Sequence, residues 1–287
     1  MRFGHVQVDV VEDGRFGLDG GDMFGIIPRP LWARSNPPDE ANRIEMGLRC
    51  LLIRDGERTI LIDNGMGERG RERQRQQMAL DRTKVPSLID NLKRLGVDRN
   101  DITDMVFTHF HFDHNGGTVM SDGTLTFPHA MHHGSKTNYN HSLDPSPKDA
   151  GSFRSEDREG LVIGQNLKLY EGAWRLTDDL DFLVVHGHTA GMHLPRLSAG
   201  DETLLCCADL VPTSSHLHLP WVMGYDCLPV QTIEEKIDLL AQAYADNWIL
   251  AFEHDPEIDA CRVVKDERGR YARGEVIDLG GKGRSWG

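Results

Sequence analysis

One short segment concentrates side chains that bind metal ions. Residues 109–114, HFHFDH, contain three imidazoles and one carboxylate. The segment follows an apolar run and ends near a glycine pair, which predicts a turn at the edge of a sheet. Neutral imidazole and carboxylate are ligands of zinc and related divalent cations. We therefore expect a metal site built in part from His109, His111, Asp113 and His114.

Three further apolar runs of strand length end close to a residue of the same kind. These residues are His188, Asp209 and His254. In layered α/β domains, sites form at strand ends and in the loops that adjoin them. The recurrence of this pattern at several strand ends predicts one shared metal centre. A lone histidine after a strand, such as His186, is instead interpreted as a hydrogen-bonded loop residue.

Strands and helices alternate along the chain, which predicts an α/β layered domain. An aspartate–glycine pair at 55–56 is a strong hairpin signal. Helices are expected at 86–95 and 232–247. Thr232 and Glu235 have the spacing of a capping box at the start of the second helix. The expected strands are 3–11, 50–53, 59–62, 104–109, 181–186, 203–208 and 248–252.

Three segments contain much glycine, proline or charge and are expected to lie outside the sheets. The glycine-rich stretch Asp13–Trp32 is expected to be a loop. It either packs its apolar residues onto the body or forms a wall or lid of a binding pocket. Residues 67–77 mix acidic and basic side chains, which predicts a solvated face. Residues 136–160 are polar and contain proline, which predicts a long surface excursion.

Composition and charge indicate an acidic globular protein. The chain has 287 residues, 39% of them apolar, and we expect a single domain over residues 1–287. Its formal net charge of -13 repels phosphate backbones and anionic lipid, so nucleic-acid and membrane partners are not expected. No apolar run approaches the roughly 20 residues of a membrane span, and no signal peptide is recognised. The five cysteines form no C-x-x-C pair, which favours a reduced, cytoplasmic protein.

The order of the candidate ligands resembles the signature of the metallo-β-lactamase superfamily. The resemblance implies an αβ/βα sandwich of two mixed sheets packed face to face, with helices on the outer faces. It also implies a dinuclear metal centre, with Asp63 as an acid that orients ligands. In that centre one metal would be held by His109, His111 and His188, the second by Asp113, His114 and His254, and both would be bridged by Asp209.

A narrower resemblance is to the YtnP-type lactonases, which are assigned to hydrolysis of N-acyl-homoserine lactones in quorum quenching. It rests on the segments DGGDMFG (19–25), PRPLW (28–32), ADLVPT (208–213) and WVMGYD (221–226). The implied substrate is a lactone with an apolar acyl chain. The apolar residues expected to line the pocket for this chain could instead pack in the core. The candidate substrate-binding residues are Met23, Phe24, Trp32, Trp221 and Tyr225.

The implied chemistry is hydrolysis by a metal-bound hydroxide. Two divalent cations, zinc first and manganese, cobalt or iron as alternatives, would share a water whose pKa falls to about 7. The hydroxide would open the lactone ring, and Asp113 or His216 would deliver a proton to the leaving oxygen. Related lactonases place a tyrosine near the substrate carbonyl, where Pro212 stands here. His216, His218 and Tyr225 are candidates for this contact with the substrate carbonyl.

Other functions on the same site are alternatives. An aryl-ester or organophosphate hydrolase, or a thioester hydrolase of the glyoxalase II kind, needs the same hydroxide. Aspartate rather than cysteine at position 209 argues against one major subclass of β-lactamases, and no G-x-S-x-G motif offers a serine nucleophile. A non-enzymatic signal-binding protein is a more distant alternative. The apolar stretch 23–32 could pack against a second subunit, so a homodimer is a hypothesis.

Overall fold

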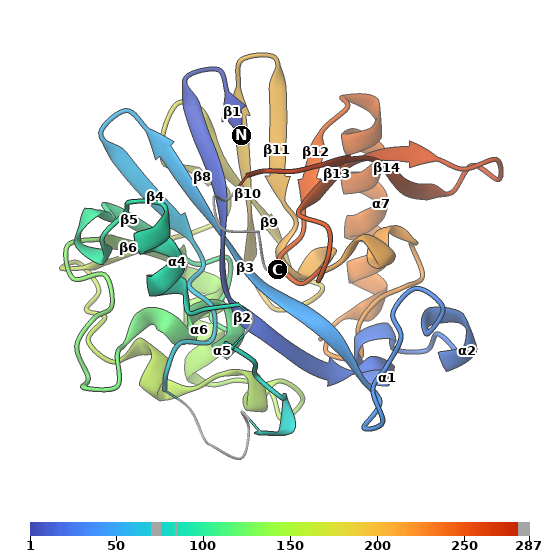
Figure 1. Cartoon of the computed structure of the whole chain (residues 1–287), viewed down its shortest axis with the longest axis horizontal. Coiled ribbons are helices and arrows are strands. Elements are labelled where there is room, and N and C mark those ends of the chain that lie inside the picture. Colours follow the sequence, from blue (N-terminus) through green and yellow to red (C-terminus); the bar gives the residue numbers. More distant parts are fainter. Residues whose placement is uncertain (70–75, 84, 281–287) are drawn as a thin grey trace.

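Two β-sheets packed face to face form the body of the molecule (Figure 1). The computed structural model describes residues 1–69, 76–83 and 85–280. Within these ranges each sheet has seven strands of mixed direction, and helices pack on the outer faces. The expected αβ/βα sandwich is therefore confirmed. None of the helices in these ranges combines the length and apolar character that crossing a bilayer demands.

The first sheet carries its strands in chain order. They are β1 (Arg2–Phe3), β2 (Val6–Asp19), β3 (Arg43–Asp55), β4 (Arg58–Ile62), β5 (Asp104–Val106), β6 (Met131–Ser135) and β7 (Leu167–Tyr170). β4 to β7 run parallel, so their carboxyl ends lie at the same edge of the sheet. The histidine-rich segment 109–114 follows β5 and therefore lies at that edge.

The second sheet runs from β14 at one edge to β8 at the other. Its strands are β8 (Trp174–Arg175), β9 (Leu180–Val185), β10 (Met192–Ala199), β11 (Glu202–Cys206), β12 (Ile249–Ala251), β13 (Ala260–Lys265) and β14 (Tyr271–Ile277). β11 and β12 are parallel neighbours. Their carboxyl ends therefore carry Asp209 and His254 to the same edge.

Helices connect the strands on both outer faces. The α-helices are α1 (Gly20–Phe24), α2 (Arg29–Trp32), α4 (Leu88–Arg94), α5 (Phe112–Asn115), α6 (Lys136–Leu143) and α7 (Pro229–Ala245). Short 3-10 helices are η1 (Arg99–Asp101), η2 (Gly116–Thr118), η3 (Ala150–Ser152), η4 (Ser155–Arg158), η5 (Ala208–Leu210) and η6 (Ser214–Leu217). Figure 1 shows α7 beside the second sheet and α4 beside the first.

Three apolar layers hold the sandwich together. Between the sheets, Val106 of β5 packs in one cluster with Leu204 of β11. On the outer face of the second sheet, Leu240 of α7 joins the cluster of Leu250. On the outer face of the first sheet, Leu92 of α4 packs in a third cluster. Because both sheets are buried on two faces, their strand ends are held in fixed positions relative to one another.

The glycine-rich stretch Asp13–Trp32 is not a loop throughout, which corrects the sequence-based expectation. β2 continues to its end at Asp19, paired with β3 along the way. The register shifts near Gly14, whose φ is 110°, so the strand is irregular there without ending. Only residues 20–32 leave the sheet, as α1, α2 and the turns between them.

Two further expectations are wrong in part. The last long helix begins at Pro229 rather than at Thr232, so Thr232 and Glu235 form no capping box at its start. Segment 136–160 is more than a surface excursion, because it forms α6 and contributes several buried side chains. The charge-rich segment 67–77 lies partly outside the described residues.

Candidate metal centre

The histidine-rich segment forms a tight turn after β5. His109, His111 and His114 are almost completely buried, and His111 directly precedes α5. The turn packs closely on the loop after β4, since a Cβ added at Gly117 would lie 2.2 Å from the carbonyl oxygen of Asn64. Glycine at this position permits that close approach. The close packing fixes the position of the turn, and with it the positions of the three imidazoles.

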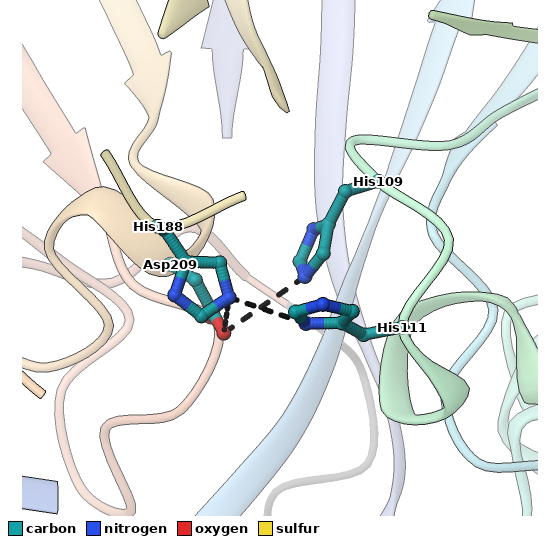
Figure 2. Close-up of side chains that lie close together, drawn as sticks. All are labelled: His109, His111, His188 and Asp209. Atoms are coloured by element: carbon teal, nitrogen blue, oxygen red, sulfur yellow. Dashed lines mark hydrogen bonds and ion pairs between the residues drawn. The ribbon is translucent and has the colours of Figure 1, made fainter. Parts of the chain in front are cut away.

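Seven side chains from several strand ends gather in two adjoining groups. The first group is His109, His111, His188 and Asp209, and the second is Asp113, His114 and His254. Within each group the potential ligand atoms lie within 4.8 Å of one another. Figure 2 shows the three imidazoles of the first group around the carboxylate oxygen of Asp209. The two groups contain all the metal-ligand candidates of the sequence analysis, and each could hold one cation.

The carboxylate of Asp209 lies between the two groups and turns one oxygen to each. Its Oδ2 is 3.2 Å from Nε2 of His188 and 4.0 Å from Nε2 of His109. Its Oδ1 is 3.4 Å from Nε2 of His114 and 3.1 Å from Nε2 of His254. A carboxylate in this position can bridge two cations.

Acceptors behind the rings determine which imidazole nitrogen faces the centre. Nδ1 of His188 is 2.9 Å from Oδ1 of Asp226, and Nδ1 of His254 is 2.9 Å from the carbonyl oxygen of Gly47. Because a carboxylate or carbonyl oxygen only accepts, the proton of each neutral ring is assigned to Nδ1. The lone pair of Nε2 then points into the cluster, as metal coordination requires.

Asp63 contacts the motif from behind. Its Oδ2 accepts from Nδ1 of His114 at 3.0 Å and from the hydroxyl of Thr108 at 2.6 Å. The same hydroxyl is 3.0 Å from Nδ1 of His109, where it can act as acceptor. A second acid, Glu253, lies 3.3 Å from Nδ1 of His114. These contacts are the kind that orient metal-binding imidazoles.

Several buried polar atoms of the cluster have no hydrogen-bond partner among the described residues. They include Nε2 of His109, Nε2 of His111 and Oδ1 of Asp209. In the second group, Nε2 of His114 and Nε2 of His254 face each other at 3.2 Å. Buried acceptors without donors are unfavourable unless a cation satisfies them. This donor set of imidazole and carboxylate fits zinc and neighbouring divalent metals.

The carboxylates make the cluster attractive to positive charge. Burial and neighbouring imidazoles lower the pKa of His109 well below its usual value. At His188 burial acts in the same direction, but the Asp209 and Asp226 carboxylates raise the pKa to about 9. Burial alone would raise the pKa of Asp209, but His114 and two further imidazoles hold it well below its usual range. An ionised Asp209 is therefore favoured, as a bridging ligand between cations requires.

A narrow pocket of about 60 Å³ opens onto the two groups. Of the five residues expected to contact substrate, Met23 and Tyr225 line it. Phe24 and Trp32 lie in the core instead, with stacked rings 5.4 Å apart and almost no exposed surface. Trp221 packs against the edge of this pair, 5.3 Å from Phe24, and is not part of the lining. Phe24, Trp32 and Trp221 therefore pack in the core, which was the alternative to lining the pocket.

His216, a candidate proton donor, has contacts that do not favour this role. Its Nδ1 is 2.8 Å from Oγ1 of Thr213, and its Nε2 is 2.8 Å from the carbonyl oxygen of Met23. Its ring stacks on Phe24 at 4.8 Å, and burial lowers its pKa to about 3. Both nitrogens are engaged, so His216 ties η6 to α1. Of the three candidates for contact with the substrate carbonyl, Tyr225 is the one that lines the pocket.

Sequence reasoning missed several residues that surround the cluster. Glu253 carries a weak signal, because it is an acid beside the candidate ligand His254. Asp226 ends the segment 221–226, which supported the narrower resemblance without a role for this residue. Phe153 carries no signal, because long-range packing brings it to the site. Phe153 places its ring edge-on to His111, with centroids 4.7 Å apart.

The sequence pattern of one protein family matches most of the chain. The family is described as the metallo-beta-lactamase superfamily, and its pattern matches residues 48–254. Among curated proteins, an N-acyl homoserine lactonase of Bacillus thuringiensis is 23% identical over 231 residues. The match covers 76% of this chain and 85% of that relative.

Solved structures share the fold over nearly the whole length. A probable metal-dependent hydrolase from Staphylococcus aureus is 24% identical, with a TM-score of 0.88 over 96% of this chain and 100% of that chain. AidC, a dizinc quorum-quenching lactonase solved with a bound product, is 22% identical, with a TM-score of 0.80 over 96% of this chain and 97% of its own. At these identities the structural likeness establishes the fold alone.

Proposed function

The chain belongs to the metallo-beta-lactamase superfamily and is a hydrolase of that family. We propose that it uses two divalent metal ions to open the lactone ring of N-acyl-homoserine lactones. The observation that carries the proposal is the carboxylate of Asp209, whose two oxygens face two separate groups of metal-binding side chains. The B. thuringiensis relative and AidC are both lactonases by name, which supports this substrate class.

Each metal would have three side chains of its own and share Asp209 with the other. Zinc suits the mixed imidazole and carboxylate donors, and AidC is a dizinc protein. Manganese, cobalt and iron accept the same donors. One metal would be held by His109, His111 and His188, and the other by Asp113, His114 and His254.

When bound, the two cations would supply an acidified water and a Lewis acid for the carbonyl oxygen. Asp113 lines the pocket, with Oδ2 3.7 Å from Nε2 of His254. Its carboxylate would hold a proton and pass it to the oxygen that leaves as the ring opens. The hydroxyl of Tyr225 donates to Oδ2 of Asp22 at 3.3 Å, and it would turn from this acceptor to a substrate carbonyl. Burial and the carboxylate of Asp22 raise the pKa of Tyr225, so this hydroxyl stays a neutral donor.

The chemistry of the pocket favours a neutral substrate with an apolar part. The whole chain has a formal charge of -13, which disfavours the approach of an anionic substrate, whereas the charges of Asp113 and Asp209 in the lining would be offset by the two cations. Leu18, Met23 and Phe112 give the pocket an apolar side. A lactone with an acyl chain satisfies both conditions.

The test combines metal analysis with a panel of substrates. The purified protein should contain about two metal ions per chain. It should hydrolyse N-acyl-homoserine lactones faster than a thioester, paraoxon or a chromogenic cephalosporin. His111→Ala and Asp209→Ala should lower metal content. Their kcat/KM should fall by more than roughly 100-fold, the upper range for removing a residue that only hydrogen-bonds to a metal ligand. His129→Ala is the matched control, because His129 is exposed on the surface.

The outcomes separate the alternatives. Hydrolysis by a preparation shown to be free of metal would overturn the mechanism. Faster turnover of the thioester or paraoxon than of any lactone would reassign the substrate class. Bound metal without hydrolysis of any member of the panel would favour a signal-binding protein.

A further inference from the structure

One lysine side chain of helix α7 is completely buried. Lys236 has no exposed surface, although its side chain ends in an ammonium group. The ammonium nitrogen lies 3.0 Å from the carbonyl oxygen of His218, 3.3 Å from that of Leu219 and 2.7 Å from that of Trp221. Lysine is almost never buried without partners, because desolvation of its charge is unfavourable. The three carbonyl oxygens are the partners that make this burial possible.

These three carbonyl oxygens belong to one irregular segment of the chain. Residues 218–226 connect η6 to α7 and contain no helix or strand. Buried backbone carbonyls need hydrogen-bond donors, and a segment outside helices and strands lacks the regular ones. A lysine ammonium has three N–H donors and no acceptor, so it can serve all three oxygens at once. Lys236 therefore fixes the first part of segment 218–226 on α7.

The last residue of the same segment is Asp226, the acceptor for Nδ1 of His188. Asp226 is also the carboxylate whose charge acts on Lys236. Burial lowers the pKa of the Lys236 ammonium to about 7, and the charge of Asp226 opposes that fall. Lys236 and Asp226 are thus connected along the backbone of the segment and through their charges.

Helix α7 holds two loops with two consecutive residues. Glu235 accepts from the backbone of the loop that carries His188. Lys236 donates to the segment that carries Asp226. The two loops also contact each other, because the backbone N–H of Cys227 donates to the carbonyl oxygen of His188 at 3.0 Å. One helix therefore sets the position of a candidate metal ligand relative to the carboxylate that orients it.

We propose that Lys236 is a positioning residue of the metal centre, whose ammonium holds segment 218–226 so that Asp226 meets His188. This inference rests on the proposed function, because it takes the cluster as a metal site. Lys236 acts through the segment, since it is not part of the pocket lining. Without the ammonium, three carbonyl oxygens lose their donor, and the segment should move to find other partners.

The test removes the ammonium and keeps an unbranched side chain. Lys236→Met does this, and Lys236→Gln, which keeps two donors on a shorter chain, replaces it if the methionine variant does not fold. Lys93→Met, an exposed lysine on α4, is the matched control. Each substitution is made in the wild type and in Asp226→Ala. Competition with a chromogenic chelator measures zinc affinity at about pH 6.5, where most of the ammonium is charged.

The positioning role predicts a loss of zinc affinity that depends on Asp226. Lys236→Met should lower the affinity by about tenfold, within the roughly 10–100-fold range for disturbing the acceptor of a metal-binding imidazole. In Asp226→Ala the same substitution should lower it by less than about twofold, because no carboxylate remains to be positioned. Hydrogen exchange of the metal-free protein should become faster at the N–H of Met223, which donates to Asp226. Lys93→Met should match its parent in both backgrounds.

Equal losses of zinc affinity in the two backgrounds would overturn the positioning role, since Lys236 would then act on the fold alone. An unchanged affinity in Lys236→Met, or unfolding of both variants at position 236, would overturn it too. If the metal-loaded wild type hydrolyses no lactone, the proposed substrate class fails, and the zinc affinities still decide the role of Lys236. A wild type that binds no zinc would reject both proposals.

Discussion

Four of the five imidazoles of the centre, those of His109, His114, His188 and His254, are oriented by an acceptor on their far side. For His188 that acceptor is Asp226, which lies in the loop before α7 and is almost completely buried. The second oxygen of Asp226 accepts from the backbone N–H of Met223 at 3.0 Å. The same carboxylate therefore fixes a candidate metal ligand and the backbone of Met223, a residue that lines the pocket.

Removing the Asp226 carboxylate should weaken metal binding. Asp226→Ala leaves Nδ1 of His188 without its acceptor, and zinc affinity should fall by about 10–100-fold. Asp226→Asn keeps one acceptor oxygen of two, so its effect should be intermediate. Competition with a chromogenic chelator measures the affinity. Asp238→Ala, an exposed aspartate on α7, is the control. Equal zinc affinity in wild type and Asp226→Ala would show that this contact does not act on the metal.

At the residue scale the sequence predicts the metal ligands better than it predicts the residues that contact and orient them. The candidate ligands stand out because few residue types bind metals and because they follow apolar runs. His216 shows the limit of this reasoning. It lies seven positions after Asp209, but the carbonyl oxygen of Met23 that engages its ring is 193 residues away. No pattern local in sequence predicts such a contact.

Helix α7 holds the loop that carries His188. Glu235 accepts from the backbone N–H groups of His186 and Gly187, at 2.7 and 3.0 Å. A Cβ added at Gly187 would lie 2.4 Å from the backbone nitrogen of Thr232. The loop therefore rests directly on the first turns of the helix. Glu235, expected to cap its own helix, instead binds this loop.

Gly187→Ala should push the loop away from α7. Overpacking of this kind typically destabilises a protein by about 1–3 kcal/mol. We expect a loss of that size in urea unfolding with a chelator present, and a lower zinc affinity, since the loop carries His188. Gly151→Ala makes the same substitution where no atom lies within 4 Å. Its stability should stay within about 0.5 kcal/mol of the wild type. Equal stability of both variants would contradict the docking of the loop on the helix.

At the element scale, strands with strong apolar patterns were predicted and mixed ones were missed. Every expected strand overlaps an observed one, and the hairpin at 55–56 is present, but β2 and β3 extend well beyond the expected bounds 3–11 and 50–53. β10 was not expected, because Met192–Ala199 contains histidine, proline, arginine and serine. Pro195 is tolerated because pairing with β11 begins only at Arg196, so its missing N–H interrupts no bond of that ladder.

Across the whole molecule, the two groups of the centre draw their ligands from both sheets. His109 and His114 follow β5 of the first sheet, whereas His188, Asp209 and His254 follow strands of the second. Each group therefore spans the gap between the sheets. A cation bound to either group would connect the two halves of the sandwich in addition to the apolar layer between them.

Removal of metal should therefore destabilise the whole fold. A ligand that binds the folded state at 100 times its Kd stabilises it by about 2.7 kcal/mol, and for a chain of this size we expect Tm to fall by roughly 5 °C or more on chelation. Calorimetry with chelator and after return of zinc measures the shift. Hydrogen exchange should increase at the ends of β5, β11 and β12 together, because ligands from both sheets lose their common partner. The Tm of Asp209→Ala should respond much less to chelator, since the carboxylate shared by both groups is gone. A wild-type Tm unchanged after verified loss of metal would mean that the apolar layers alone hold the sheets together, and that the cations serve chemistry without supporting the fold.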